Sequence, residues 1–293
     1  MKINYKDIVV YTCLIGEHEG LNKQPQIKNS KIRHVCLTDD KNLKSSDWEI
    51  LFVNRIFPAD AHRSQRYFKI KPHLFFPDYE YSLYIDNTVV LKKNAEIFIE
   101  MVINDCSINL QKPFLSLPYH SFRDDLLSEF NECSNLKLDK QIKIYNQLID
   151  YSKININLLK RKPYWAGILF GNHNNSQLIN FSEIWFANLC KYSKRDQLSI
   201  IYSANQAELT IFGFNLNNTL SEFHKWPVKN FINKQKTGDE NLLDSIPFNL
   251  LANLSKKIKT NEEILNKINK KRNANFNLIY NFKKLKKLLK KLF

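Results

Sequence analysis

An acidic residue interrupts an apolar stretch at a place where chemistry could be done. Residues Tyr81 to Leu91 read YSLYIDNTVVL. In this stretch Asp86, Asn87 and Thr88 separate a buried-strand pattern from a second apolar run. A carboxylate there is costly to bury unless a cation or a hydrogen-bond donor faces it. We therefore predict a metal or phosphate site at a strand end. The alternative is a turn between two hairpin strands, because Asp and Asn favour turns.

A basic helix face precedes this stretch. Residues 61–76 read AHRSQRYFKIKPHLFF and predict a helix that ends at Pro72. Arg63, Arg66 and Lys69 recur on it at intervals of three, which places them on one face. Such a face would suit the phosphates of a nucleotide. The alternative is an ordinary solvated helix face.

A dense polar cluster follows a predicted strand at residues 114–120. His120 ends that strand, and Arg123, Asp124 and Asp125 come directly after it. One of the acidic residues could cap the next helix, but a cap needs fewer polar groups than this junction offers. We therefore take His120 and Asp125 as candidates for a functional site.

A carboxylate and an amide lie together near residue 200. Asp196 and Gln197 open a predicted helix whose apolar face includes Leu198 and Ile201. Free helix amides would satisfy an N-terminal Asp, which is the plain structural explanation. Arg195, Asp196 and Gln197 together also offer a cation, a carboxylate and an amide to sugar hydroxyls.

The elements that must position these residues predict an α/β domain. A buried-strand pattern at residues 8–15 ends at Gly16, and a second strand at residues 34–37 leads to Asp39. Open α/β sheets bind ligands at such strand ends, so Gly16 and Asp39 are candidates to hold a nucleoside. The alternatives are an ordinary turn after the first strand and a cap at Asp39.

Net charge is distributed unevenly along the 293 residues. The formal charge is +15, and the 13 Lys/Arg and 2 Glu of the segment Lys256 to Phe293 give that segment +11. The first 255 residues therefore hold only +4. A nucleic-acid-binding protein would have a basic stripe across its folded domain, so we expect no nucleic-acid partner.

The chain is predicted to comprise a domain at residues 1–228, a polar linker at residues 229–250 and a basic amphipathic helical tail at residues 251–293. The final residues, NFKKLKKLLKKLF, place Phe and Leu on one face and Lys on the other. This pattern is typical of a helix on an anionic membrane surface. A coiled-coil partner helix and a solvated tail are the alternatives.

Cysteine usage and the first residues indicate the compartment. The five cysteines have no CxxC or zinc spacing, so they are predicted to be reduced thiols of a cytosolic protein. The first residues lack the pattern of a signal peptide. We expect a cytoplasmic protein that is peripheral at the membrane face.

With these motifs in order, the chain resembles the glycosyltransferase-like domain family of plant mucilage-biosynthesis and turgor-regulation proteins and their bacterial relatives. The resemblance spans roughly residues 9–203. Its matching stretches are YTCLIGEHEGL, CLTDD, RSQRYFKIKPHLFFPDYEYSLYIDNTVVL, LPYHSFRDDLLSE, WAGILFGNHNN and WFANLCKYSKRDQLSIIYS.

The resemblance implies a GT-A-like fold, a Rossmann-type α/β sandwich with a central mixed sheet. It also implies a nucleoside-diphosphate sugar as donor, with Mn²⁺ or Mg²⁺ held at a DxD motif. Asp86 matches the first position of that motif, Asn87 stands in the middle, and Thr88 replaces the last Asp. His224 matches a late His that related transferases use for the metal. Asp196 and Gln197 match a pair that contacts the donor sugar.

We therefore expect sugar transfer from a nucleotide sugar, with UDP as the expected nucleotide, to a glycan or lipid-linked acceptor in polysaccharide or envelope biosynthesis. In this interpretation Arg63 or Arg66, together with Lys69, assists at the diphosphate, and Asn87 contributes to the same donor site. His120 or Asp125 contacts the acceptor or serves as the base. One alternative is a membrane-associated lipid hydrolase of the ceramidase kind, which would need a tight His/Asp metal cluster. Another is a non-catalytic sugar-binding module.

Overall fold

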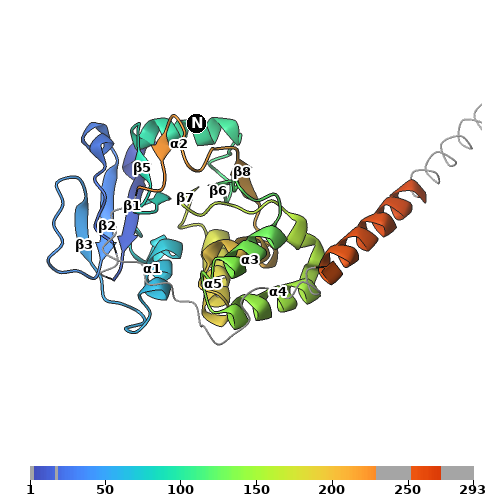
Figure 1. Ribbon diagram of the computed structural model, residues 1–293. Helices are drawn as coiled ribbons and strands as arrows, with labels where there is room; N and C mark the ends of the chain where they lie inside the picture. The colour runs from blue at the N-terminus through green and yellow to red at the C-terminus, as the bar shows by residue number, and fades with distance from the viewer. Residues whose placement is uncertain (1–2, 17–18, 229–251, 272–293) are drawn as a thin grey trace, which may run out of the picture. The chain divides into compact units, whose positions relative to one another are not determined.

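The computed structural model describes residues 3–16, 19–228 and 252–271 (Figure 1). The chain divides into two compact units, Met1–Ser245 and Ile246–Phe293. The predicted linker and the predicted tail beyond residue 271 lie outside the described residues. In the second unit, residues 252–271 form a helix. No described helix is both long enough and apolar enough to cross a bilayer.

The first unit is built on a mixed sheet of seven strands in the order β3-β2-β1-β4-β7-β6-β8. Strands β1 to β4 are parallel, β7 is antiparallel to both of its neighbours, and β6 and β8 are parallel to each other. The strands are β1 Ile8–Leu14, β2 Arg33–Thr38, β3 Glu49–Phe52, β4 Tyr81–Ile85, β6 Leu115–Pro118, β7 Ile168–Gly171 and β8 Ile211–Phe214. The prediction of an α/β fold with a central mixed sheet is confirmed.

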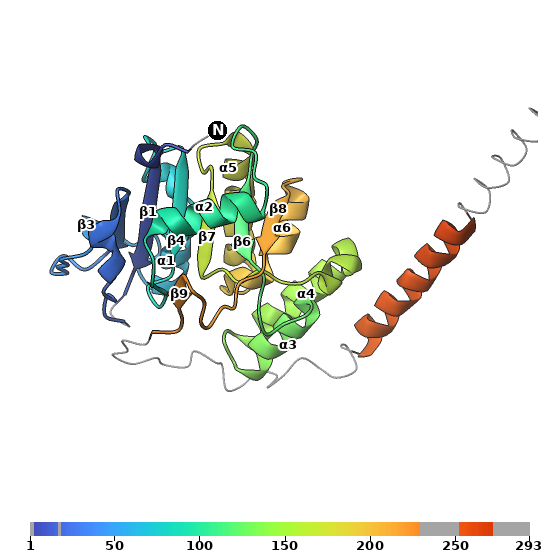
Figure 2. The same ribbon diagram turned by 90° about the horizontal axis from the view of Figure 1, so that it is seen from above.

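Helices cover both faces of the sheet. Figures 1 and 2 show α2 on one face and α1 and α5 on the other. The α-helices are α1 Ala61–Ile70, α2 Ala95–Asp105, α3 Leu126–Asn135, α4 Gln141–Asn155, α5 Ser176–Lys191 and α6 Ile200–Gln206. Short 3-10 helices are η1 Tyr5–Asp7, η2 Pro25–Asn29, η3 Pro72–Leu74, η4 Ile156–Lys160 and η5 Asp196–Leu198.

The central strands form because their residues are apolar on both sides. All residues of β1 and β4 are buried, as expected for strands covered by helices on both faces. Val10 of β1 packs in one core with Phe98 of α2. On the opposite face, the Tyr11 and Tyr84 rings meet edge to face at 5.1 Å, and the Tyr11 hydroxyl donates to the Lys69 carbonyl at 2.5 Å.

The order of the strands creates a switch point between β1 and β4. The chain proceeds outward from β1 to β2 and β3, then returns to add β4 on the other side of β1. In open α/β sheets, ligands bind beside the carboxyl ends of the strands at such a point. A separate pair, β5 Val90–Leu91 and β9 His224–Lys225, runs antiparallel beyond β4.

Candidate active site

The carboxyl edge of the sheet gathers segments that are far apart in the chain. Gly16, Asp39 and Asp86 follow the parallel strands β1, β2 and β4, so they lie at the same edge. Because β7 runs antiparallel to β4, the residues just before it also lie there. The Asp86 amide accordingly donates to the Gly167 carbonyl at 2.8 Å.

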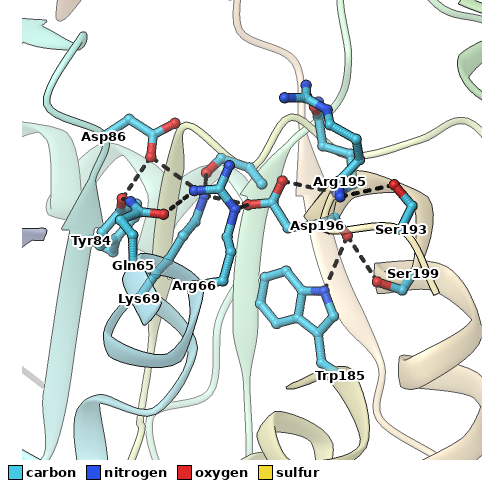
Figure 3. A network of polar contacts seen from close by, with 12 residues as sticks. Gln65, Arg66, Lys69, Tyr84, Asp86, Trp185, Ser193, Arg195, Asp196 and Ser199 are labelled. Atoms are coloured by element: carbon cyan, nitrogen blue, oxygen red, sulfur yellow. Dashed lines mark hydrogen bonds and ion pairs between the residues drawn. The ribbon is translucent and has the colours of Figure 1, made fainter. Parts of the chain in front are cut away.

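Lys69 lies between two carboxylates at this edge. Its Nζ is 2.7 Å from Asp196 Oδ2, 2.6 Å from the Ala166 carbonyl oxygen and 3.5 Å from Asp86 Oδ1 (Figure 3). Only 1% of the Lys69 side chain is exposed. An ammonium has three N–H donors, and these three oxygens can accept all of them.

Asp86 is the more open of the two carboxylates. Its side chain is 29% exposed, and its Oδ1 accepts the Tyr84 hydroxyl at 2.6 Å. Burial, followed by the charge of Asp86, raises the pKa of Tyr84 well above its usual value, so the hydroxyl stays protonated and donates. Gln65 Nε2 donates to the same hydroxyl at 2.9 Å. Among the described residues, no donor contacts Asp86 Oδ2, so this oxygen is available to a ligand.

Asp196 is the buried carboxylate, with 4% of its side chain exposed. Arg66 Nε lies 3.1 Å from its Oδ2 and adds a second cation to that of Lys69. Burial raises the pKa of Asp196, but the charges of Arg66 and Lys69 outweigh burial and hold it far below its usual value. The carboxylate is therefore ionised at neutral pH. Trp185 Nε1 donates to the Asp196 carbonyl at 3.1 Å and fixes the backbone.

The amide of Gln197 is directed by its neighbours. Its Nε2 lies 3.4 Å from the Tyr164 carbonyl, and its Oε1 lies 3.4 Å from an Arg195 amino group. Gln197 is buried, in the 3-10 helix that begins at Asp196. The pair predicted to contact a sugar is thus held beside Lys69. We call Lys69, Arg66, Asp86 and Asp196 the Lys69 cluster.

The predicted nucleoside residues meet one another. The Gly16 amide donates to Asp39 Oδ1 at 2.9 Å, and Arg55 pairs with Asp39 Oδ2. Gly16 has φ 85°, a conformation that favours glycine. The ends of β1 and β2 are therefore tied together by one carboxylate at the carboxyl edge of the sheet.

The residues after Asp86 hold the surrounding loops. Asn87 Oδ1 accepts the Asn22 amide at 2.9 Å, and Asn87 Nδ2 donates to the Gly20 carbonyl at 3.0 Å. Thr88 Oγ1 accepts from Trp226 Nε1 at 3.1 Å. Both side-chain oxygens are therefore used by donors of the chain, which leaves one carboxylate of the DNT segment for a ligand.

His224 is positioned as a structural residue. It is fully buried and stacks on Trp165 with ring centroids 5.4 Å apart. Its Nδ1 lies 2.8 Å from Ser221 Oγ and its Nε2 lies 3.0 Å from the Asn218 carbonyl, so both nitrogens have partners.

The described side chains do not by themselves form a site for a divalent cation. Residues 3–16, 19–228 and 252–271 contain no group of three or more His, Cys, Asp or Glu that could hold one. The two carboxylates at the sheet edge are already paired with Lys69 and Arg66. The metal site predicted for Asp86 and His224 stays a prediction, and the described residues offer the hydrolase alternative no His/Asp cluster.

Arg63 lies on a different part of α1 from the other two cations. Its Nη1 pairs with Asp60 at 2.6 Å, and its Nε and Nη2 donate to the Leu189 and Tyr192 carbonyls at 3.0 and 3.1 Å. Arg63 thus links α1 to the end of α5. A spacing of three residues falls short of one 3.6-residue turn, so a stripe at this spacing rotates around the helix.

Asp125 lies at the start of α3, and His120 lies in the loop between β6 and that helix. Asp125 caps that helix, since its Oδ1 accepts the Ser128 amide at 2.7 Å. His120 Nε2 lies 3.8 Å from Glu129 Oε2. Burial, and then three neighbouring cations with Arg123 first, lower the pKa of His120 to about 4. The ring is therefore neutral at neutral pH.

Sequence reasoning missed three side chains that shape the site. Tyr84 lies two residues before Asp86 at the end of β4, and the two-residue period of a strand could have identified it. Gln65 and Trp185 gave no such signal, because their partners lie 19 and 11 residues away.

A model of the TOD1/MUCI70 glycosyltransferase-like domain matches residues 1–237. The chain therefore belongs to this family, and the resemblance predicted from its motifs is confirmed. The match includes the strands, the helix α1 and the η5 segment that together form the site.

One curated relative and two solved structures illustrate the likeness. The chain is 26% identical over 168 residues to a protein of Arabidopsis thaliana described as "Probable hexosyltransferase MUCI70", and the match covers 55% of this chain and 28% of that protein. The chain thus spans less than a third of that relative's length.

The solved structures are more distant. "WbbM bifunctional glycosytransferase apo structure" aligns with TM-score 0.42 and 11% identity over 74% of this chain and 40% of that one. "Crystal Structure of A197 from STIV" aligns with TM-score 0.33 and 10% identity over 71% and 81%. These likenesses are too distant to indicate a shared function.

Proposed function

We propose that the chain transfers a sugar, a hexose by analogy with its relative, from a nucleoside-diphosphate sugar to a glycan or lipid-linked acceptor. Its family supports glycosyl transfer in general. The observation that carries the proposal is the pair Asp86 and Asp196, held by Lys69 and Arg66 at the carboxyl edge of the sheet. Polar groups that converge at such an edge are what a nucleotide-sugar site requires.

Each part of the donor would meet a different element. The loops at Gly16 and Asp39 would hold the nucleoside, with UDP as our first choice of nucleotide. Arg66, which is 16% exposed, would face the diphosphate and stabilise the charge that develops as the sugar leaves. Asp196 and Gln197 would orient the sugar. Fixed charges of this kind favour the transition state without reorganising during the reaction.

His120 is proposed to contact the acceptor instead of acting as the base. A general base is most effective when its pKa lies near the working pH. The pKa of His120 is lowered to about 4, so the neutral ring binds a proton weakly. Its Nδ1 accepts the Phe122 amide at 3.2 Å, so its Nε2 carries the hydrogen that can be donated to an acceptor hydroxyl. Asp125 would act only through its cap of α3, which places the loop that contains His120.

The test is turnover of a nucleotide-sugar panel by the full chain. Release of nucleoside diphosphate would be followed for UDP-, GDP-, ADP- and dTDP-sugars, with the chain as it is and with Asp86→Ala. Asp78→Ala is the matched control, because Asp78 is exposed in the loop before β4. We expect release that Asp86→Ala abolishes and Asp78→Ala retains. Absence of both binding and release with every donor, or wild-type release by Asp86→Ala, would contradict the proposal. Binding without release would favour a sugar-binding module.

We further propose that the basic C-terminal segment brings the chain to an anionic membrane surface on the cytoplasmic side. The support is the alternation of Lys with Leu and Phe at residues 282–293, which lie outside the described residues. The full chain should co-sediment with vesicles of phosphatidylglycerol and phosphatidylcholine. It should not co-sediment with phosphatidylcholine alone, or after Lys→Gln changes at positions 283, 284, 286, 287, 290 and 291. Equal binding in all cases would refute this.

A further inference from the structure

We propose that Lys69 is a built-in counter-charge that makes binding of the nucleoside diphosphate independent of divalent metal. The inference rests on the proposed function, because it concerns how that donor site tolerates an anion beside two carboxylates. Lys69 is a positioning residue in this account. It fixes Asp86 and Asp196 and offsets one of their two negative charges, while Arg66 pairs with Asp196 and faces the donor.

The ammonium of Lys69 is surrounded by oxygen atoms, as a bound metal cation would be. Its Nζ joins two carboxylates, at 2.7 Å from Asp196 and 3.5 Å from Asp86, and a backbone carbonyl at 2.6 Å. These are oxygen ligands of the kind that hard divalent cations take. The side chain is 1% exposed, so solvent does not compete for the ammonium.

Charge at the site is already balanced. Asp86 and Asp196 contribute two negative charges, and Lys69 and Arg66 contribute two positive ones within 3.5 Å of a carboxylate oxygen. A divalent cation placed at Asp86 would be repelled by the ammonium of Lys69. An anionic diphosphate meets no surplus of negative charge there, so no metal is needed to admit it.

The other candidate ligands of a metal are engaged elsewhere. The side-chain oxygen of Asn87 accepts from Asn22, and that of Thr88 accepts from Trp226. Both nitrogens of His224 have partners. Residues 86–88 therefore offer a metal one carboxylate and no free second side-chain oxygen.

Calorimetric titration of the full chain with UDP, GDP, ADP and dTDP tests the inference. The titration is done in EDTA, in Mg²⁺ and in Mn²⁺. The Kd for the best ligand should agree within about threefold among the three conditions. A Kd weaker by about tenfold or more in EDTA would overturn the inference and leave the proposed function standing. Failure of every nucleotide to bind in all three conditions would overturn both.

The variant Lys69→Gln should bind the nucleotide in a metal-dependent way, in contrast to the wild type. It leaves the two carboxylates with one cation, so nucleotide binding in EDTA should weaken by about tenfold or more, and Mn²⁺ should restore it to within about threefold of wild type. Lys71→Gln is the matched control, because Lys71 is also buried but pairs with Glu183 at 2.5 Å. It should bind in EDTA like wild type.

Two results with the variant would count against the inference. Lys69→Gln that binds in EDTA as well as wild type would show that the counter-charge is dispensable. A folded Lys69→Gln that Mn²⁺ does not restore would reduce Lys69 to a structural residue. The near-ultraviolet circular dichroism spectrum reports whether the variant folds, and if it does not, the wild-type titrations alone decide.

Discussion

Replacement of Asp196 by Asn tests whether the Lys69 cluster is held together by charge. The substitution keeps the shape of the side chain but removes its negative charge. Lys69 would then be left buried, and Arg66 partly buried, without their shared carboxylate, whose Oδ2 lies 2.7 and 3.1 Å from their nitrogens. Breaking a buried ion pair by removing one partner costs about 3–5 kcal/mol, because a buried charge is left uncompensated.

The expected loss can be read from urea unfolding of the full chain at pH 7. With a denaturant slope of about 3 kcal/mol/M, a loss of about 3–5 kcal/mol lowers the unfolding midpoint by roughly 1 to 2 M. Asp60→Asn is the matched control, since Asp60 pairs with Arg63 on the same helix at 2.6 Å but with both side chains partly exposed. That change should cost no more than about 1 kcal/mol.

The pH dependence of this effect has a defined sign. The pKa of Asp196 is lowered in the folded chain, so its contribution to stability is complete above the unfolded pKa of about 3.9. The contribution is lost as the pH falls toward the folded pKa. The difference between wild type and Asp196→Asn should therefore shrink below about pH 4.

Two results would refute this reasoning about charge. One is an Asp196→Asn variant that is destabilised no more than Asp60→Asn. The other is strict additivity of Asp196→Asn with Lys69→Met, because two side chains 2.7 Å apart should couple by about 1–3 kcal/mol.

Three further predictions concern neighbours of the cluster. Tyr84→Phe removes the hydroxyl that donates to Asp86 at 2.6 Å, so thermal unfolding should show an unfolding free energy lower by about 1 kcal/mol. Nucleotide-sugar turnover should also fall, and unchanged turnover would contradict this prediction. Gly167→Ala would place a Cβ 2.2 Å from the Trp165 ring, so urea unfolding should show an unfolding free energy lower by about 1–3 kcal/mol. Calorimetry should also show weaker nucleotide binding, and a variant unchanged in both measurements would contradict the prediction. Burial lowers the pKa of His173 to about 4, so the stability that its neutral ring contributes is complete above about pH 6.5 and declines as the pH falls toward 4. His173→Asn should therefore flatten the curve of unfolding free energy against pH between about 4 and 6.5, and an unchanged slope would contradict this.

The strand ends could be predicted from sequence because their signals are local. Apolar runs mark β1, β2 and β4, and each is followed within two residues by Gly16, Asp39 or Asp86. The carboxyl ends of parallel strands meet at one edge, so a parallel sheet makes these residues neighbours. The sequence predicts the strand ends, and the structure shows that the three strands are parallel and adjacent.

The partner of Lys69 could not be predicted in the same way. Asp196 lies 127 residues further along the chain, and its approach depends on the packing of α1 against α5. The direction of β7 could not be predicted from the sequence either, because an apolar pattern does not show whether a strand runs parallel or antiparallel to its neighbours. That direction brings Ala166, just before β7, to the edge where its carbonyl accepts from Lys69.

A nucleotide-bound crystal structure tests the central claim most directly. The full chain would be crystallised in EDTA with the nucleoside diphosphate that binds best in calorimetry. We predict the base and ribose beside Asp39 and Gly16, and the diphosphate beside Arg66 and Asp86 at the carboxyl edge of the sheet. A nucleotide bound away from this edge, or a nucleotide that enters these crystals only with a divalent metal at Asp86, would contradict the account.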